Sequence, residues 1–96
     1  MQFNITGRHL DISPALREHI EKMLNRLEQT YQNITSAQVT LRIVKHEKIA
    51  ETTLSIAASN DIHAEGRHED MYAAIDLLAE KLEKQLQRQK EKLEER

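Results

Sequence analysis

Five histidines are the side chains best suited to bind a metal ion: His9, His19, His46, His63 and His68. Strand alternation would place His63 and Glu65 on one face, whereas His68 and Glu69 would fall in the connection that follows. The chain has no cysteine and no histidine pair with the His-x-x-x-His spacing of a helical zinc site. We therefore expect no metal site, with His63 on a strand surface and His68 helping to cap the next helix.

The chain also lacks the settings in which serines, glycines or paired carboxylates support catalysis. No serine lies in a Gly-x-Ser-x-Gly turn. Gly7 and Gly66 are the only glycines, so no glycine-rich loop can surround a phosphate. Glu69 and Asp70 fit better as negative charges at a helix N-terminus than as an acid-base pair. We expect no catalytic residue, no enzyme activity and no cofactor.

Basic side chains near the C-terminus recur at helical spacing and are the main functional signal. At about 100° per residue, four of them share one flank of the expected apolar stripe: Lys81, Lys84, Arg88 and Lys92. Acidic side chains occupy the outer surface beyond them: Asp76, Glu80, Glu83 and Glu94. The basic row is roughly 20 Å long and could follow a phosphate backbone. The pattern alone favours a solvated or partner-binding helix surface over a nucleic-acid-binding one.

An earlier helix shows a weaker charge segregation, with His19, Lys22 and Arg26 on one flank and Glu21 and Glu28 on the other. If the two helices packed with their basic flanks adjoining, one continuous positive surface would result. The sequence does not determine which flanks face each other.

Two helices and four strands are expected to position these side chains. Phe3, Ile5 and Gly7 alternate with polar residues in a first strand. Ser13 and Pro14 then start a helix, whose apolar stripe is Leu16, Ile20, Met23, Leu24, Leu27 and Tyr31. Alternation predicts further strands over 37–43, around 52–56 and over 62–66, with 45–48 as a charged connection and 59–61 as a turn. From about Asp70 the helical pattern returns in Met71, Ala74, Ile75, Leu78, Leu82, Leu86 and Leu93.

The predicted fold class is α+β, in the order β-α-β-β-β-α, with a four-stranded sheet and two helices on one face. Strands joined by short connections should pair antiparallel. We expect a single domain over residues 1–96, and we expect the last turns of the final helix to fray at the end of the chain.

Composition narrows the function classes. The chain has 96 residues and 39% hydrophobic residues, enough for one modest core. Aromatic residues make up 3%, so base stacking on aromatic rings is not a major binding device. The absence of cysteine fits a reducing compartment, and no signal peptide or membrane-spanning run is visible. We expect a cytoplasmic protein without membrane contact. The net charge of −2 argues weakly against nucleic acid, unless the charges are segregated.

The sequence resembles the ribosome hibernation promoting factors and related ribosome-associated inhibitors along essentially its whole length. The resemblance rests on Asn4-Ile5-Thr6-Gly7, on Asp11 to Arg17, on Leu27-Glu28, on Ile62-His63-Ala64, and most specifically on Asp70-Met71-Tyr72-Ala73-Ala74-Ile75-Asp76. It implies a fold similar to double-stranded-RNA-binding domains, and binding to the small ribosomal subunit and its rRNA. The implied site is the mRNA/tRNA channel of the 70S ribosome at the A and P sites, where the protein blocks translation sterically during stress or stationary phase. The RNA-binding residues it implies are Arg17, Lys22, Arg26, Lys81, Lys84, Arg88, Lys90 and Lys92.

Within that family, the length of the chain resembles the short form, which is monomeric when free and promotes ribosome dimers together with a modulation factor. The segment Arg67-His68-Glu69-Asp70 looks closer to the inhibitor version, which opposes dimers. A hypothesis from another class is a protein-interaction module that modulates a sigma factor. It predicts that Met71, Leu78 or Leu93 docks the long helix to a partner.

Overall fold

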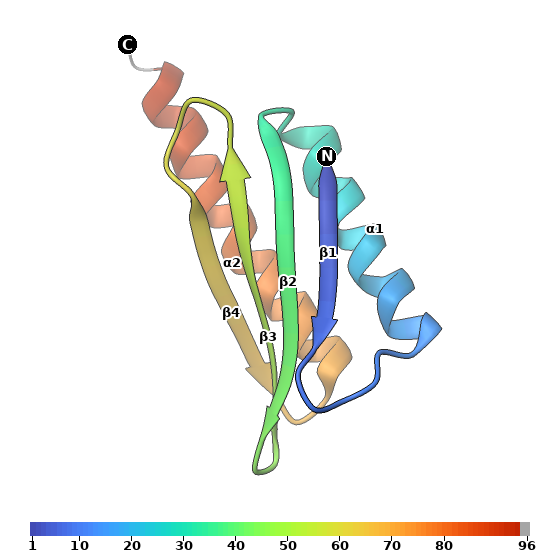
Figure 1. Ribbon diagram of the computed structural model, residues 1–96. Coiled ribbons are helices and arrows are strands. Elements are labelled where there is room, and N and C mark those ends of the chain that lie inside the picture. The colour runs from blue at the N-terminus through green and yellow to red at the C-terminus, as the bar shows by residue number, and fades with distance from the viewer. Residues whose placement is uncertain (95–96) are drawn as a thin grey trace.

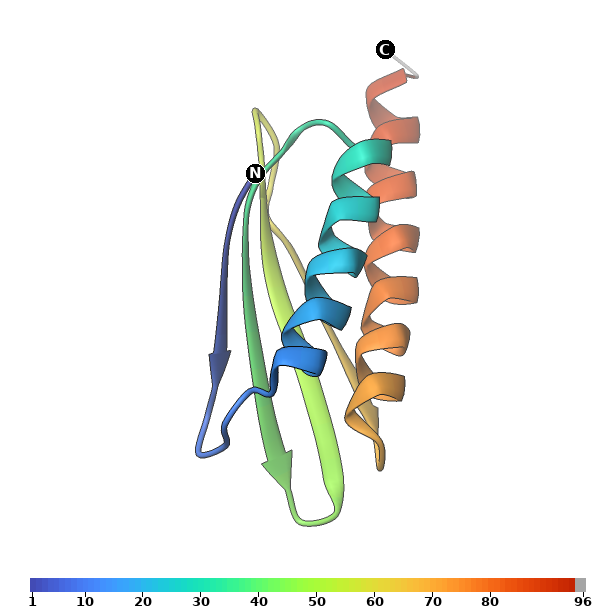
Figure 2. The same cartoon turned by 90° about the vertical axis from the view of Figure 1, so that its right-hand side faces the viewer.

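The computed structural model describes residues 1–94, with side chains up to Lys92. It forms one four-stranded sheet with both helices on the same face (Figures 1 and 2). The elements are β1 (Gln2–Gly7), α1 (Pro14–Thr30), β2 (Ile34–Val44), β3 (Glu47–Ile56), β4 (Ile62–His68) and α2 (Met71–Glu94). The predicted order and layering are confirmed. Two predictions fall partly outside the described residues. They are the placement of the Leu93 and Glu94 side chains and the fraying of the last turns of the final helix.

The sheet has the strand order β1-β2-β3-β4, so β1 and β4 are its two edges. β2, β3 and β4 pair antiparallel, as predicted from their short connections. β1 pairs parallel with β2, because the chain returns through α1 before β2 begins. The edge formed by β4 lies under α2, while α1 covers the β1 side of the sheet (Figure 1).

The hairpin between β2 and β3 is tighter than the sequence pattern predicted. The prediction of a charged connection over 45–48 is wrong, because Val44 pairs with Glu47 and only Lys45 and His46 link the strands. Lys45 takes a positive φ of 58°, which lets the chain reverse in so few residues. Charged residues can enter these strands because the hairpin tip projects beyond the helices into solvent (Figure 2).

The fourth strand also extends further than predicted, because His68 pairs with Lys48 and belongs to β4. Its ring nevertheless acts at the helix start, as expected: Nδ1 accepts the backbone N–H of Asp70 at 3.0 Å. Asp70 in turn accepts the backbone N–H of Tyr72 at 3.1 Å and caps α2. His63 is an exposed residue of β4, as predicted.

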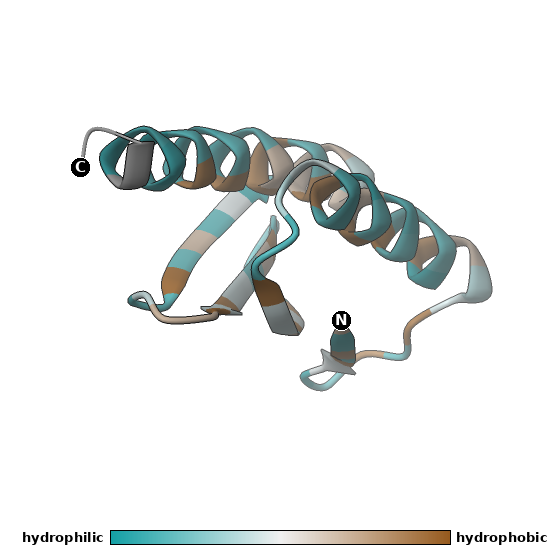
Figure 3. Cartoon of the chain, turned by 90° about the horizontal axis from the view of Figure 1, so that it is seen from above, coloured by the Kyte–Doolittle hydropathy of each residue, from teal (hydrophilic) through white to brown (hydrophobic). Residues whose placement is uncertain are grey.

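The core lies between the sheet and the two helices, and the predicted apolar stripes face it. Figure 3 shows the hydrophobic residues of both helices turned toward the sheet and the polar ones turned away. Ile20 and Leu24 of α1 and Leu78 of α2 are completely buried. The Ser13 hydroxyl accepts the backbone N–H of Leu16 at 3.1 Å, which confirms the predicted cap of α1. Full burial of each such aliphatic side chain stabilises the fold by about 1.5–3 kcal/mol.

Gly66 brings α2 unusually close to β4. A Cβ atom at this position would lie 2.1 Å from the carbonyl oxygen of Ala74 and 2.7 Å from the backbone nitrogen of Leu78. Since both are backbone atoms of α2, only a glycine allows the helix to pack at this distance. The position of the basic row relative to the sheet therefore depends on this contact.

Candidate nucleic-acid interface

Three side chains of α2, each one turn after the last, bond to the backbone along the β4 edge. Lys81 and Gln85 bond to carbonyl oxygens of β4 itself, and Gln89 bonds to the loop before it. The contacts are Lys81 Nζ to Glu65 O at 2.7 Å, Gln85 Nε2 to His63 O at 3.0 Å, and Gln89 Nε2 to Asn60 O at 3.2 Å. This ladder occupies acceptors at the sheet edge and holds the helix alongside the strand, with the two running in opposite directions.

The basic row lies beside this ladder, over a groove between α2 and β4. Lys81, Lys84 and Arg88 line a first hollow of about 650 Å³. Arg88 and Lys92 line a second hollow of about 520 Å³, beside the loop before β4. The two hollows share Gln85 and Arg88, so they adjoin along α2. We call this surface, with its four cations, the basic groove.

The carboxylate that lines the first hollow is already paired on the open face of the sheet. Glu65 accepts Arg67 Nε at 3.0 Å and lies 3.5 Å from the guanidinium of Arg42. The hydrogen bond and charge of Glu65 raise the pKa of Arg67. Because its charge is engaged there, Glu65 does little to neutralise the cations of the basic groove. The second hollow includes one carboxylate, Asp61.

The helices do not adjoin through their basic flanks, so that possibility is wrong. His19 Nε2 lies 2.8 Å from Asp76 Oδ1, and the Tyr31 hydroxyl donates to Glu83 at 3.0 Å. The acidic side of α2 therefore faces α1, while its basic row faces the β4 edge. The apolar stripes must point at the sheet, and this requirement fixes the rotation of each helix about its axis.

The cations of α1 form a separate group. Arg17, Lys22 and Arg26 are all exposed. Lys22 pairs with Glu18 at 3.2 Å one turn earlier, an exposed pair of the kind that contributes about 0.3–0.5 kcal/mol. The structure thus brings four of the eight predicted residues together in the basic groove and leaves these three on the other helix.

Lys90 is the eighth predicted residue, and it lies apart from both groups. It lines a pocket at the end of α1, with Tyr31 and Asn33, about a third of a turn around α2 from Lys84. Burial raises the pKa of the Tyr31 hydroxyl, and its hydrogen bond to Glu83 and the charge of Glu83 raise it further.

Sequence reasoning missed the two glutamines of the ladder. A signal for one of them was present, because Gln89 falls at the centre of the apolar stripe. A polar side chain at such a position requires a hydrogen-bond partner, and the loop carbonyl of Asn60 supplies it.

Together, the one-sided sheet, the two helices and the cationic groove at one edge define a small α+β binding domain. Residues 3–94 match the model of the family described as "Sigma 54 modulation protein / S30EA ribosomal protein". The chain belongs to this family. Within the described residues, no helix is long and apolar enough to span a membrane.

Characterised relatives resemble the chain along nearly its whole length. A ribosome hibernation promoting factor from Azotobacter vinelandii is 47% identical over 96 residues, which cover 100% of this chain and 89% of the relative. The factor of the same name from Escherichia coli strain K12 is 40% identical over 95 residues, with 99% of each chain covered.

Two solved structures share the fold. A ribosomal subunit interface protein from Coxiella burnetii superposes with a TM-score of 0.88 at 39% identity, covering 94% of this chain and 98% of the other. The N-terminal domain of Protein Y from Thermus thermophilus gives a TM-score of 0.81 at 33% identity, covering 92% and 98%. The predicted family and fold class are therefore confirmed.

Proposed function

We propose that this chain is a ribosome hibernation factor that binds the small ribosomal subunit in the mRNA/tRNA channel at the A and P sites. The names of its relatives support a role at the ribosome. The observation that carries the proposal is the basic groove, a row of cations on a rigid helix beside a closed sheet edge. We assign rRNA binding to the groove, with Arg17, Lys22, Arg26 and Lys90 as further contacts.

The mechanism needs binding and bulk, without a chemical step. From Lys81 to Lys92 the row extends about 17 Å, which allows contact with several successive phosphates. Lysine and arginine recognise phosphates and RNA shape rather than base sequence. A domain with extents of 45 × 22 × 18 Å, held in the channel, would exclude mRNA and tRNA sterically. Translation would stop, and the idle ribosome would be preserved in stationary phase or stress.

The proposal includes the promotion of inactive ribosome dimers together with a modulation factor. An inhibitor-like factor that stalls ribosomes without dimers is the neighbouring possibility within the family. Sedimentation of purified ribosomes with the protein, with and without the modulation factor, distinguishes them. Dimers that form only with both proteins support hibernation promotion, whereas binding without dimers supports the inhibitor-like role.

Charge reversal tests the basic groove directly. The double variant Lys84→Glu with Arg88→Glu should abolish cosedimentation with the small subunit and keep its circular dichroism spectrum. The matched control is Arg8→Glu with Lys45→Glu, which makes the same change in net charge at exposed positions away from α2. Full ribosome binding by the groove variant, or equal loss in the control, would show that the groove is not the contact surface.

A protein-interaction module that modulates a sigma factor is the second candidate, and the family description includes such a role. Two of the docking residues predicted for it, Met71 and Leu78, do not fit because they are buried against the sheet. The side chain of the third, Leu93, lies outside the described residues. Tyr72 and Leu77 are the exposed large apolar residues of α2 within the described part of the chain. This candidate requires Leu77→Ser to weaken partner binding while ribosome binding stays unchanged.

A further inference from the structure

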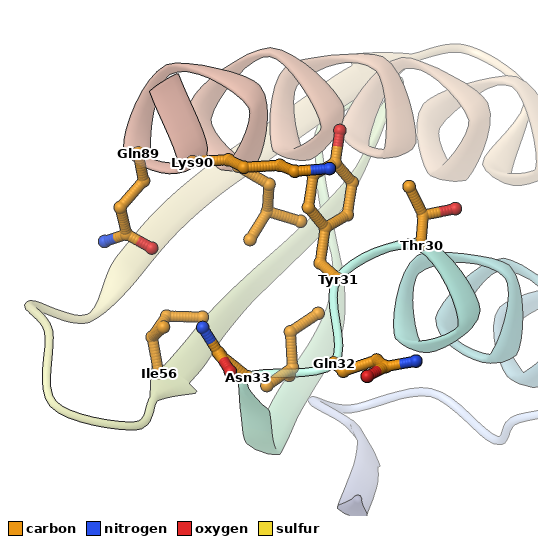
Figure 4. A pocket seen from close by; sticks show the side chains of 9 residues that line it. Thr30, Tyr31, Gln32, Asn33, Ile56, Gln89 and Lys90 are labelled. Atoms are coloured by element: carbon orange, nitrogen blue, oxygen red, sulfur yellow. The ribbon is translucent and has the colours of Figure 1, made fainter. Parts of the chain in front are cut away.

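A small pocket opens where the C-terminal end of α1 meets α2 and the ends of β2 and β3. Its volume is about 290 Å³. Figure 4 shows Gln89 and Lys90 on one side of it, Asn33 and Ile56 on the other, and the Tyr31 ring beside Lys90. Small-molecule pockets start at about 300 Å³, so this one suits a single ring system better than a peptide.

The pocket is preformed, because its walls are held by contacts elsewhere. The Tyr31 hydroxyl shares its one proton between Glu83 Oε1 at 3.0 Å and Gln87 Oε1 at 3.1 Å, and both contacts hold the ring against α2. Gln89 Nε2 donates to Asn60 O at 3.2 Å. That bond fixes the orientation of the Gln89 amide and leaves its oxygen as an acceptor. A ligand would therefore pay little to order this site.

The lining combines an apolar floor with a polar, cationic rim. Three buried aliphatic side chains form the floor: Ile34, Ile56 and Leu86. Asn33 and Lys90 are exposed at the rim. This combination offers a surface for a flat face, hydrogen-bond groups for a polar edge, and a positive charge for an anion.

We propose that this pocket, the Lys90 pocket, receives the base of one unpaired nucleotide whose phosphate pairs with Lys90. The proposal rests on the proposed function in one respect, that the nucleotide belongs to ribosomal RNA. The base would lie over the aliphatic floor, with its edge bonded to the amides of Asn33 and Gln89. Single-stranded RNA is recognised through such splayed bases, and one pocket of this kind does not require an aromatic stacking platform.

A nucleotide fits the pocket better than an aliphatic side chain of a protein partner. A purely apolar occupant would bury the Asn33 amide and the Gln89 amide oxygen without partners, which is costly. It would also make no use of the Lys90 charge. Lys92 and Arg88, two residues from Lys90 on either side in the sequence, belong to the basic groove, so a strand bound in the groove could place one base on this side of α2.

Nuclear magnetic resonance titration of the full chain tests the inference, with the four nucleoside 5′-monophosphates as probes. We expect saturable shifts of the Ile34, Ile56 and Leu86 methyl signals. Lys90→Gln should weaken this binding by about threefold, the size of an exposed ion pair. The matched control Lys84→Gln removes one charge from the basic groove and should leave the pocket shifts unchanged. Asn33→Ala, at an exposed position, should also weaken binding.

Four results would overturn the inference: no methyl shifts, shifts confined to the basic groove, equal shifts with ribose 5-phosphate, or shifts with N-acetyl-leucine amide in place of the nucleotides. The third would identify a phosphate site alone, and the fourth a docking site for an apolar protein side chain. If nucleotides do not bind in the pocket while Lys84→Glu with Arg88→Glu still abolishes ribosome binding, the inference is wrong and the proposed function stands. If the pocket binds nucleotides but that double variant binds ribosomes fully, the proposed function fails instead.

Discussion

Replacement of Gly66 by alanine should separate α2 from β4, and the structure sets the size of the effect. The added Cβ would lie 2.1 Å from the Ala74 carbonyl oxygen and 2.7 Å from the Leu78 nitrogen. Neither atom can move without the helix. The helix must therefore retreat from the strand, which strains the buried contacts of α2 and the hydrogen bonds of Lys81 and Gln85 to β4.

Overpacking a well-filled core usually costs about 1–3 kcal/mol, and a clash with backbone belongs at the upper end. We therefore expect Gly66→Ala to lower the free energy of unfolding by about 3 kcal/mol. In a domain of this size, each 1 kcal/mol lowers Tm by about 4–8 °C, so the expected loss is about 12–24 °C.

Thermal unfolding followed by circular dichroism measures this loss. His63→Ala is the matched control, because His63 is exposed on the same strand and surface changes usually stay within about 0.5 kcal/mol. Ala74→Gly should not rescue Gly66→Ala, since the clash is with the Ala74 backbone. A Tm loss for Gly66→Ala no larger than that of the control, or rescue by Ala74→Gly, would refute the close-packing argument.

Four further substitutions test the basic groove, the contact between the helices and the start of α1. Lys84→Gln should reduce the slope of log binding constant against log salt concentration for ribosome binding by about 0.7–0.9. Lys81→Gln should change this slope less, because the Lys81 Nζ is bound to a β4 carbonyl. Ribosome binding measured at several salt concentrations compares the two variants. Burial and then Glu83 raise the pKa of Tyr31, so the folded state favours the neutral phenol. This contribution of Tyr31 to the free energy of unfolding is present below about pH 10 and is lost as the pH rises through the pKa of Tyr31 in the folded state. Urea unfolding at several pH values measures the loss, and Tyr31→Phe should abolish this pH dependence. Ser13→Ala should cost about 1 kcal/mol in the same assay, and unchanged stability would exclude the cap.

Much of the fold could be predicted because the apolar residues of each helix or strand recur at the spacing typical of that kind of element. The helical spacing of Ile20 and Leu24 and the alternation of Val39 and Leu41 each identify one buried face. Strand ends could not be predicted in this way. Glu47 and Lys48 look like a loop in the sequence, but they lie in β3 because partners in β2 and β4 pair with them.

The same distinction applies to the candidate site. The basic row was predictable because its residues lie on one helix, and a single period places them. Contacts between elements were not, since nothing local shows that His19 meets Asp76 or that Lys81 bonds to the β4 backbone. Lys90 illustrates the limit: it follows Gln89 directly in the sequence, yet the turn of the helix places it in a different pocket from Lys84.

The net charge of −2 is compatible with RNA binding because several acidic residues are engaged away from the basic groove. On the open face of the sheet, Arg42 and Arg67 pair with three carboxylates, Glu47, Glu51 and Glu65. Ile49 pairs with Arg42 on one side and with Arg67 on the other, so it lies between the two arginines in the sheet. Its side chain is completely buried, although it is not part of the main core cluster. The acidic side of α2 faces α1. The β4 edge thus has four neighbouring cations against one lining carboxylate that is not paired on the open face, Asp61. The local field, rather than the net charge, determines which face a polyanion approaches. Neutral or acidic faces elsewhere would disfavour indiscriminate RNA binding, so a partner must match the shape of the groove as well as its charge.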